Sequence, residues 1–148
     1  MRQRQSFAVK VTAAAVVVIA LLVGSSSALA GATSPRAGAL HLTKECSQYQ
    51  GQAGQFCTIT SSNVPGIKVG MRVVYASAAG ADGVNSNIVV SDGNGNAAFG
   101  HVRLDFATLS GTVTLFGGTG DLRHFYAVAR VTNSDGFNWA WDGIYVSI

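Results

Sequence analysis

The chain has 148 residues, of which 11% are charged and 48% hydrophobic, and its formal net charge is +3. Arg2, Arg4 and Lys10, three of the ten basic residues, lie in the first thirty positions, which leaves seven basic and seven acidic residues in the rest. The basic isoelectric point therefore reflects the N-terminal segment alone. No Lys/Arg cluster remains to follow a nucleic-acid backbone, so we expect no nucleic-acid partner.

The first thirty residues have the three-part pattern of a secretory signal peptide. Their basic residues precede an apolar run at 11–24, and Ala28-Leu29-Ala30 matches the small-x-small rule for signal peptidase. A retained membrane anchor is the alternative, but the apolar run is shorter than the about 20 residues that cross a bilayer. We predict a signal peptide at 1–30, a secreted protein, and no stable membrane anchor after cleavage.

Residues 31–43, GATSPRAGALHLT, are small, polar and aperiodic, which predicts a flexible tether. From Cys46 onwards the sequence alternates with a period of two and is rich in β-branched and aromatic residues. The expected strands are 56–62, 71–79, 84–91, 96–106, 111–116, 122–132 and 137–148, and 44–50 is a further candidate. Tight turns separate them and no helical spacing follows position 43, so residues 44–148 are predicted to form one all-β domain, an antiparallel sandwich or barrel.

The two cysteines, Cys46 and Cys57, predict a disulfide, because an exported protein meets an oxidising environment. If 44–50 and 56–62 form a hairpin, the two residues lie nearly opposite each other on neighbouring strands. A metal site made by His41, Cys46 and Cys57 is the alternative. Structural zinc takes four ligands at short paired spacings, which this segment lacks, so we expect no metal.

The Gly-Gly-Thr-Gly at 117–120 could hold a phosphate or turn the chain. A phosphate loop leads into a helix whose amides face the anion, but the residues after Gly120 alternate as a strand. Their predicted inward face is Phe125, Ala127, Ala129 and Val131, and their outward face is His124, Tyr126, Val128 and Arg130. The segment is therefore a hairpin, and nucleotide binding is rejected.

The same parity applies to the strands before and after this hairpin. In 96–106 the residues Ala98, Gly100, Val102, Leu104 and Phe106 share a face, opposite His101, Arg103 and Asp105. In the last strand Phe137, Trp139 and Trp141 share a face. Gly143 suggests a bulge that would turn Ile144, Val146 and Ile148 inward, whereas without a bulge Tyr145 would continue the aromatic row. We favour the bulge.

Three segments carry a family resemblance: VPGIKVGMRVVYAS at 64–77, the run GNAAFGHVRLDFATLSGTVTLFGGTGDLRHFYAVARV at 95–131, and WAWDGIYVS at 139–147. They resemble the allene oxide cyclase barrel-like group, which is related in fold to the dirigent proteins, and suggest a secreted, bacterial-type member. The resemblance implies a single antiparallel eight-stranded β-barrel. It also implies a cavity that binds apolar molecules and steers a cyclisation or coupling without a cofactor.

This chain departs from the family at the reactive residues. Plant allene oxide cyclases place a Glu, an Asn and a Pro in the early strands, whereas the single Glu after position 30 here, Glu45, lies outside any matching motif. The Asp and Arg groups of dirigent proteins have no counterpart either. Cyclase activity is therefore not transferred, and the catalytic residues are unknown.

Other candidates for chemistry have simpler explanations. His101 and His124 are predicted to face water, where histidine is usually a solvated surface residue. Most Asp residues lie beside Gly or Asn in turns, where their carboxylates bond the backbone.

The aromatic residues Tyr75, Trp139 and Trp141 could either line a pocket for a flat apolar ligand or fill the barrel. We favour a filled or partly filled barrel. The first functional hypothesis is a secreted, cofactor-free barrel that binds a small apolar molecule and could assist its isomerisation or cyclisation. The second is a non-enzymatic extracellular module whose outer wall contacts the cell envelope or another protein.

Overall fold

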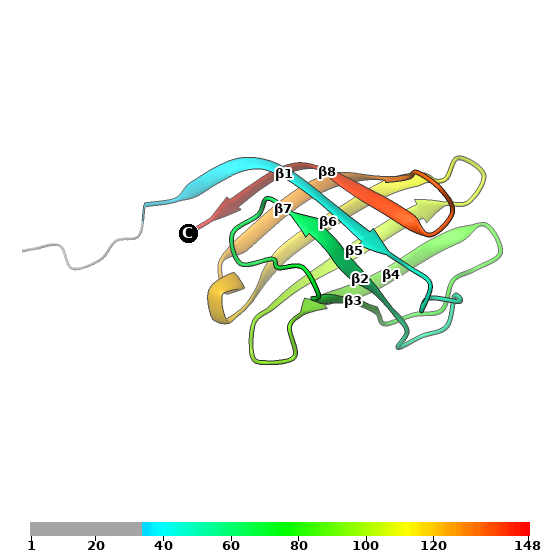
Figure 1. The fold of residues 1–148 in the computed structure, drawn as a ribbon, viewed down its shortest axis with the longest axis horizontal. Helices are drawn as coiled ribbons and strands as arrows, with labels where there is room; N and C mark the ends of the chain where they lie inside the picture. Colours follow the sequence, from blue (N-terminus) through cyan, green and yellow to red (C-terminus); the bar gives the residue numbers. More distant parts are fainter. Residues whose placement is uncertain (1–33) are drawn as a thin grey trace, which may run out of the picture. The chain divides into compact units, whose positions relative to one another are not determined.

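The computed structural model describes residues 34–148, where eight antiparallel strands form a closed barrel (Figure 1). Each strand pairs with its neighbours in sequence, and β8 pairs with β1 to close the barrel. The strands are β1 (Arg36–Glu45), β2 (Phe56–Ser62), β3 (Arg72–Tyr75), β4 (Gly83–Ser91), β5 (Ala97–Asp105), β6 (Ser110–Thr119), β7 (Phe125–Asn133) and β8 (Asn138–Ser147). The predicted all-β, eight-stranded antiparallel barrel is confirmed, and within 34–148 no helix is long and apolar enough to cross a membrane.

Strand β1 corrects the predicted tether. Residues 36–43 belong to this strand, and the chain after Glu45 turns instead of continuing as a strand to residue 50. Leu40 and Leu42 point into the barrel and are fully buried, whereas His41 between them is exposed. Only these two leucines alternate among small and polar residues, so the sequence pattern does not predict a strand here. The predicted signal peptide at 1–30 and the start of the predicted tether lie outside the described residues.

The third strand is shorter than predicted. Its ladder ends at Tyr75, and the expected continuation to residue 79 instead crosses the end of the barrel. There the Ala79 amide donates to the Gly51 carbonyl, and the Ser77 amide donates to the Ser86 hydroxyl. The first bond joins the β3–β4 connection to the β1–β2 connection, and the second joins it to β4, so this end of the barrel has a fixed outline.

The glycine-rich hairpin between β6 and β7 is confirmed. It contains a single 3₁₀ turn, η1 (Gly120–Leu122), and the chain then enters β7 as a strand. Gly117 and Gly120 have φ angles of 85° and 58°, a region in which side chains with a Cβ are strained. The predicted parity of β7 is also confirmed, since Phe125, Ala127, Ala129 and Val131 are buried and the residues between them are exposed.

The bulge predicted at Gly143 is wrong. Strand β8 pairs with β1 and β7 without a register shift at this residue, so Tyr145 continues the inward aromatic row and Ile144 lies 68% exposed. A Cβ on Gly143 would lie 2.0 Å from the Val128 carbonyl oxygen. The glycine therefore allows two neighbouring backbones to approach closely, which is the other common reason for a glycine inside a strand.

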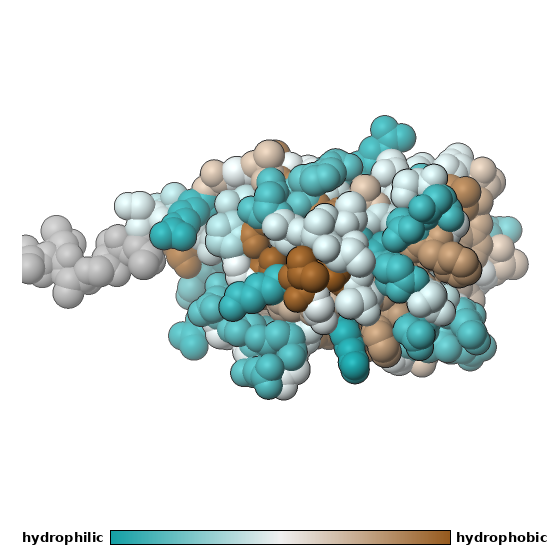
Figure 2. Space-filling model, in the orientation of Figure 1, coloured by the Kyte–Doolittle hydropathy of each residue, from teal (hydrophilic) through white to brown (hydrophobic). Residues whose placement is uncertain are grey.

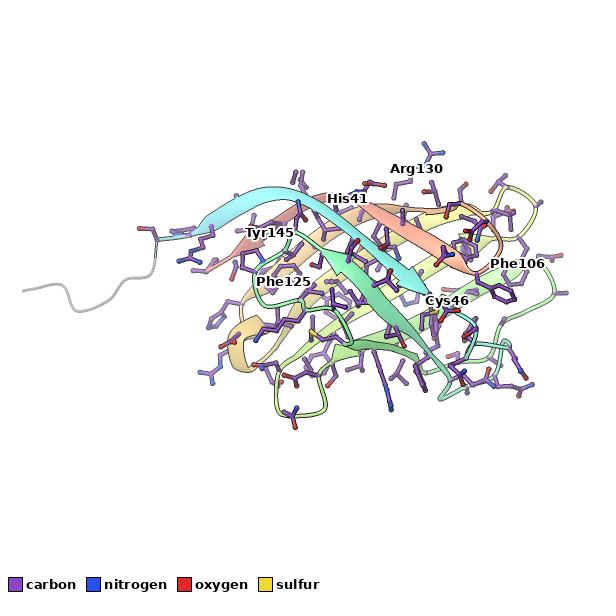
Figure 3. The ribbon with its side chains drawn as sticks, in the orientation of Figure 1. His41, Cys46, Phe106, Phe125, Arg130 and Tyr145 are labelled. Carbon is purple, nitrogen blue, oxygen red and sulfur yellow. A yellow bond between two sulfur atoms is a disulfide. The ribbon has the colours of Figure 1, made fainter. Side chains whose placement is uncertain are left out.

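The middle of the barrel is packed with apolar side chains. Trp141 is fully buried there. Toward the end of the barrel opposite Cys46, Phe125 and Tyr145 stack with ring centroids 5.7 Å apart (Figure 3). The largest fully buried side chains are Trp141, Phe125, Leu40, Leu42, Ile59, Ile88, Leu115, Leu122, Val73, Val90, Val113 and Val131. Burial of such side chains is the main stabilising contribution to a domain of this size.

Candidate ligand pocket at one end of the barrel

A cavity of about 540 Å³ opens at the end of the barrel where β1, β3, β5 and β7 finish. Inward side chains of several strands form its wall, and the connections before β2 and β4 and before β8 complete it. It is lined by Lys44, Cys46, Tyr49, Gln50, Gly51, Gln52, Tyr75, Ala79, Gly80, Val84, Val102, Leu104, Phe106, Val131, Gly136, Phe137 and Trp139. The barrel is thus partly filled, and the open part has the size of a small-molecule site.

Two aromatic side chains lie at the mouth of this cavity, and the exposed side chains of Gln50 and Gln52 also line it. Phe106 at the end of β5 and Phe137 before β8 line it and are 38% and 63% exposed. Figure 3 places Phe106 and Cys46 at the same end, on the right in that view. In Figure 2 hydrophilic side chains cover much of the visible face, and apolar side chains gather near its centre and at this right-hand end. Exposed aromatic rings around a concave site are typical of a binding surface for apolar molecules.

The interior of the cavity holds one basic side chain, Lys44, which is only 3% exposed. Its Nζ donates hydrogen bonds to Tyr75 Oη at 2.5 Å, and to Cys57 Sγ and Cys46 Sγ at 3.5 and 3.6 Å. It also lies 5.2 and 5.5 Å from the ring centroids of Tyr75 and Trp141. In residues 34–148 no carboxylate forms an ion pair with Lys44.

Burial without a counter-ion changes the protonation of this amine. Loss of hydration lowers the pKa of Lys44 from 10.5 to about 7, because the ammonium form is the one that burial penalises. Burial also raises the pKa of Tyr75, with a smaller contribution from the neighbouring Tyr49. Near neutral pH the cavity therefore contains an amine that is neutral in a large fraction of molecules, beside a phenol that keeps its proton.

Tyr49 adds a second phenol to the group. Its ring stacks on Tyr75 with the centroids 4.3 Å apart, and burial raises its pKa as well. The buried Oη of Tyr49 has no hydrogen-bond partner among the described residues, and the same holds for Nε1 of Trp141. Buried polar atoms are nearly always paired, so an unpaired hydroxyl in a cavity wall is available to an oxygen or nitrogen atom of a ligand.

The disulfide between Cys46 and Cys57 is confirmed. Their Cα atoms are 4.3 Å apart, because Glu45 pairs with Thr58 at the end of the β1–β2 ladder and the cysteines come next. Both sulfurs are occupied by this bond, which overturns the alternative of a metal bound by His41, Cys46 and Cys57. The bond lies in the wall of the cavity beside Lys44 and fixes the β1–β2 connection next to it.

The three predicted ligand-binding residues occupy different places. Tyr75 and Trp139 line the cavity, Tyr75 almost fully buried and Trp139 half-buried. Trp141 lies one inward position further along β8, is fully buried, and does not line the cavity. The structure brings Tyr75 and Trp139 together at the same site and assigns Trp141 to the packed interior below it.

Lys44 is the site residue that the sequence interpretation missed. The sequence interpretation ends the tether at residue 43 and makes 44–50 only a further strand candidate, so it gives the Lys44 side chain no direction. The signal was present in the alternation of Leu40, Leu42, Lys44 and Cys46, which share the inward face of β1. A lysine at an apolar position of a strand is unusual enough to indicate a site.

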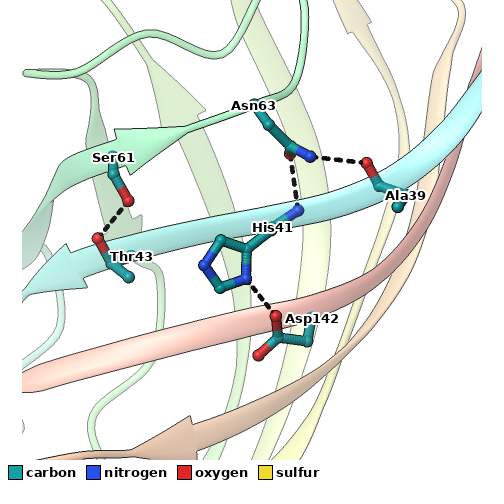
Figure 4. A network of polar contacts seen from close by, with 6 residues as sticks. All are labelled: Ala39, His41, Thr43, Ser61, Asn63 and Asp142. Atoms are coloured by element: carbon teal, nitrogen blue, oxygen red, sulfur yellow. Dashed lines mark hydrogen bonds and ion pairs between the residues drawn. The ribbon is translucent and has the colours of Figure 1, made fainter.

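Two histidines, His41 and His101, lie with their polar partners on the outer wall of the barrel. His41 on β1 bonds Asp142 on β8, and both side chains are more than half exposed (Figure 4). Asn63 accepts from the His41 amide and donates to the Ala39 carbonyl, which attaches the β2–β3 connection to β1. His101 bonds Asn85 and Asn87 across β4 and β5. These contacts connect neighbouring elements on the surface, and none of the residues lines the cavity.

No protein-family model and no curated protein sequence matches the chain. In a comparison with solved structures, the chain is similar to the pterocarpan synthase dirigent protein GePTS1. The TM-score is 0.47 and the identity is 14%, and the match covers 82% of this chain and 94% of that one. At this level of similarity the chemistry of the cavity has to be inferred from the side chains of this chain alone.

Proposed function

We propose that this protein is a secreted barrel that binds a small apolar molecule in the cavity at its open end. The observation that carries the proposal is the cavity itself: about 540 Å³, lined mostly by apolar side chains, with one buried amine and two phenols inside and two exposed glutamines, Gln50 and Gln52. Such a combination of hydrophobic lining and few polar groups is typical of small-molecule sites. The leader-like segment at 1–30 and the Cys46–Cys57 disulfide support a location outside the cytoplasm.

The polar groups define what the molecule should carry. An oxygen atom on an otherwise apolar ligand can accept from Lys44 or Tyr49, and the ring of Trp139 offers a flat contact surface. Any cofactor-free isomerisation or cyclisation would need acid–base groups at the ligand. Lys44, Tyr49 and Tyr75 are the titratable side chains that line the cavity, so they are the candidates for that role.

Calorimetric titration with 2-naphthylmethanol, a neutral apolar probe, tests the proposal. Saturable binding to the protein is expected, and Val84→Phe should weaken it at least about ten-fold because the new ring fills the cavity. Val128→Phe makes the same substitution on the outer wall, where Val128 is 55% exposed, and should leave binding unchanged. Absence of saturable binding, or equal loss in both variants, would contradict the proposal.

An interaction module remains the second candidate because the outer wall carries an apolar patch. Phe116, Tyr126 and Val146 lie side by side across β6, β7 and β8, and Val128 is paired with Ile144 in the next row. All five are between 38% and 68% exposed, which is typical of a protein contact surface. Sedimentation velocity over a range of concentrations tests self-association, which Ile144→Asp should weaken; a monomer at all concentrations would argue against a second copy as the partner.

A further inference from the structure

Lys44 has a feature that apolar binding alone does not require. A buried amine is unfavourable in an apolar cavity, and a leucine or methionine would offer the same apolar contact without the cost of desolvation. Within residues 34–148 no carboxylate neutralises it, and its one oxygen partner is the phenol of Tyr75 at 2.5 Å. The amine and the phenol both line the cavity that we assign to the ligand.

We propose that Lys44 Nζ forms a reversible imine with the aldehyde or ketone group of a small apolar molecule bound in this cavity. The inference rests on the proposed function, since the molecule has to enter the same site. It adds the chemical class of the ligand, an apolar carbonyl compound, and a covalent role for one residue.

The geometry supplies the two groups that imine formation needs. The neutral amine attacks the carbonyl carbon, a C–N bond forms, and the electron pair of the C=O π bond moves to oxygen. The oxygen then takes up one proton and the nitrogen gives one up, which yields a carbinolamine. The C–O bond then breaks, the oxygen leaves as water with a proton from an acid, and nitrogen loses its remaining proton to form C=N. Tyr75 Oη, in contact with Nζ, can donate a proton to the oxygen and take back one that the nitrogen releases, so the phenol ends each step as it began. The overall change is amine plus carbonyl to imine plus water, with no oxidant or reductant.

The surroundings favour this reaction over simple charge pairing. Burial leaves Lys44 neutral in a large fraction of molecules near pH 7, and the neutral form is the nucleophile. The titratable groups that face it are Tyr75 from β3 and, stacked on Tyr75, Tyr49 from the β1–β2 connection; the disulfide sulfurs do not titrate. A carboxylate is often held by a bidentate arginine, and among residues 34–148 no arginine lines this cavity.

Reductive trapping of the full chain tests the inference. The protein is incubated with 2-naphthaldehyde near pH 7.5, treated with sodium cyanoborohydride, and digested for peptide mass spectrometry. We expect a naphthylmethyl group on Lys44 at more than about ten times its level on the exposed Lys68, because Lys44 combines a neutral amine with a binding site. Lys44→Met should abolish the adduct without changing the circular dichroism spectrum, and Lys68→Met should leave the adduct on Lys44.

The matched probes 2-naphthylmethanol and 2-naphthoate separate the outcomes. If the alcohol binds but the aldehyde leaves no preferential adduct on Lys44, the imine is excluded and the proposed function stands. If naphthoate binds more tightly than the aldehyde and Lys44→Met removes that preference, Lys44 pairs with anions and the inference is overturned. If none of the three probes binds, the proposed function itself fails.

Discussion

Lys44 is a buried basic side chain in a position where an apolar residue would cost the fold less. Every other inward position near it on β1 is apolar or a bonded cysteine, and Lys44 is the buried basic side chain among residues 34–148. Its amine has lost its hydration and gained only a phenol, two weakly accepting sulfurs and two aromatic faces. Groups held in such costly environments are characteristic of functional sites, which is why we assign it the central role in the cavity.

The lowered pKa of Lys44 predicts how stability should depend on pH. Between about pH 7 and 10.5 the unfolded chain binds a proton at Lys44 that the folded protein does not, so stability should rise with pH across this window. The free energy of unfolding of the natural protein, relative to Lys44→Met, should increase by about 1 kcal/mol per pH unit from pH 7 to 9. Denaturant titrations at several pH values measure this difference, with Lys68→Met as the control for loss of a surface lysine. A difference that does not change with pH would show that the amine is not desolvated.

At the scale of elements, the β1–β2 hairpin organises the site. Its pairing skips one residue where Thr43 faces Ser61 and Lys44 faces Ile59, so Thr60 forms a bulge. The Thr43 hydroxyl bonds the hydroxyls of both Thr60 and Ser61 on the outer face of this irregularity (Figure 4 shows the Ser61 bond). Bulges commonly redirect side chains next to functional sites. Beyond the bulge the disulfide joins the two strands in the cavity wall.

Removing the disulfide should therefore loosen the hairpin and the cavity together. The double variant Cys46→Ala/Cys57→Ala should lower the free energy of unfolding by about 2 to 4 kcal/mol, because the unfolded chain is no longer closed into a loop. Chemical unfolding with and without a reducing agent measures the effect. The natural protein should lose a similar amount on reduction, while the variant should not respond. Equal stability of the variant and the oxidised natural protein would contradict a structural role for the bond.

The sequence predicted the elements well where alternation was strong and poorly where it was diluted. Strands β4 to β7 and their Asn/Asp/Gly turns were predicted within a few residues, because long apolar alternation and turn chemistry agree there. β1 was missed since only Leu40 and Leu42 mark its buried face before Lys44 interrupts the pattern. The bulge at Gly143 was wrong because a glycine in a strand can equally mark close approach of two backbones, and that choice depends on the neighbouring Val128.

The site was only partly predictable, because alternation along a strand gives the face of a residue but not its depth in the barrel. Tyr75 and Trp139 could be chosen as aromatic residues with inward parity, but closure of the barrel decides which inward residues meet at its open end. Trp141 has the same parity as Trp139 and belongs to the packed interior, a difference of depth that parity does not encode. Lys44 and Tyr49 come from a strand end and a turn that the sequence left without an assigned direction.

At the scale of the whole barrel, the two ends are packed differently. Apolar side chains fill the middle, Phe125 and Tyr145 stack toward one end, and the other end is hollow and rimmed by Phe106 and Phe137. Eight strands make a barrel just wide enough to be filled by side chains or to hold one small ligand. In this barrel side chains fill the middle, and one end has room for a small ligand. A rigid closed wall around a partly open interior is well suited to hold a ligand in one orientation.

The most direct test of the account is where a bound apolar molecule lies. Nuclear Overhauser effects between the naphthyl ring of 2-naphthylmethanol and valine methyl groups of the isotope-labelled protein can locate it. We predict contacts to Val84, Val102 and Val131, which line the cavity, and none to Val128 or Val146 on the outer wall. Contacts confined to Val128 and Val146, with none to the three cavity valines, would place the apolar site on the outside of the barrel and contradict the account.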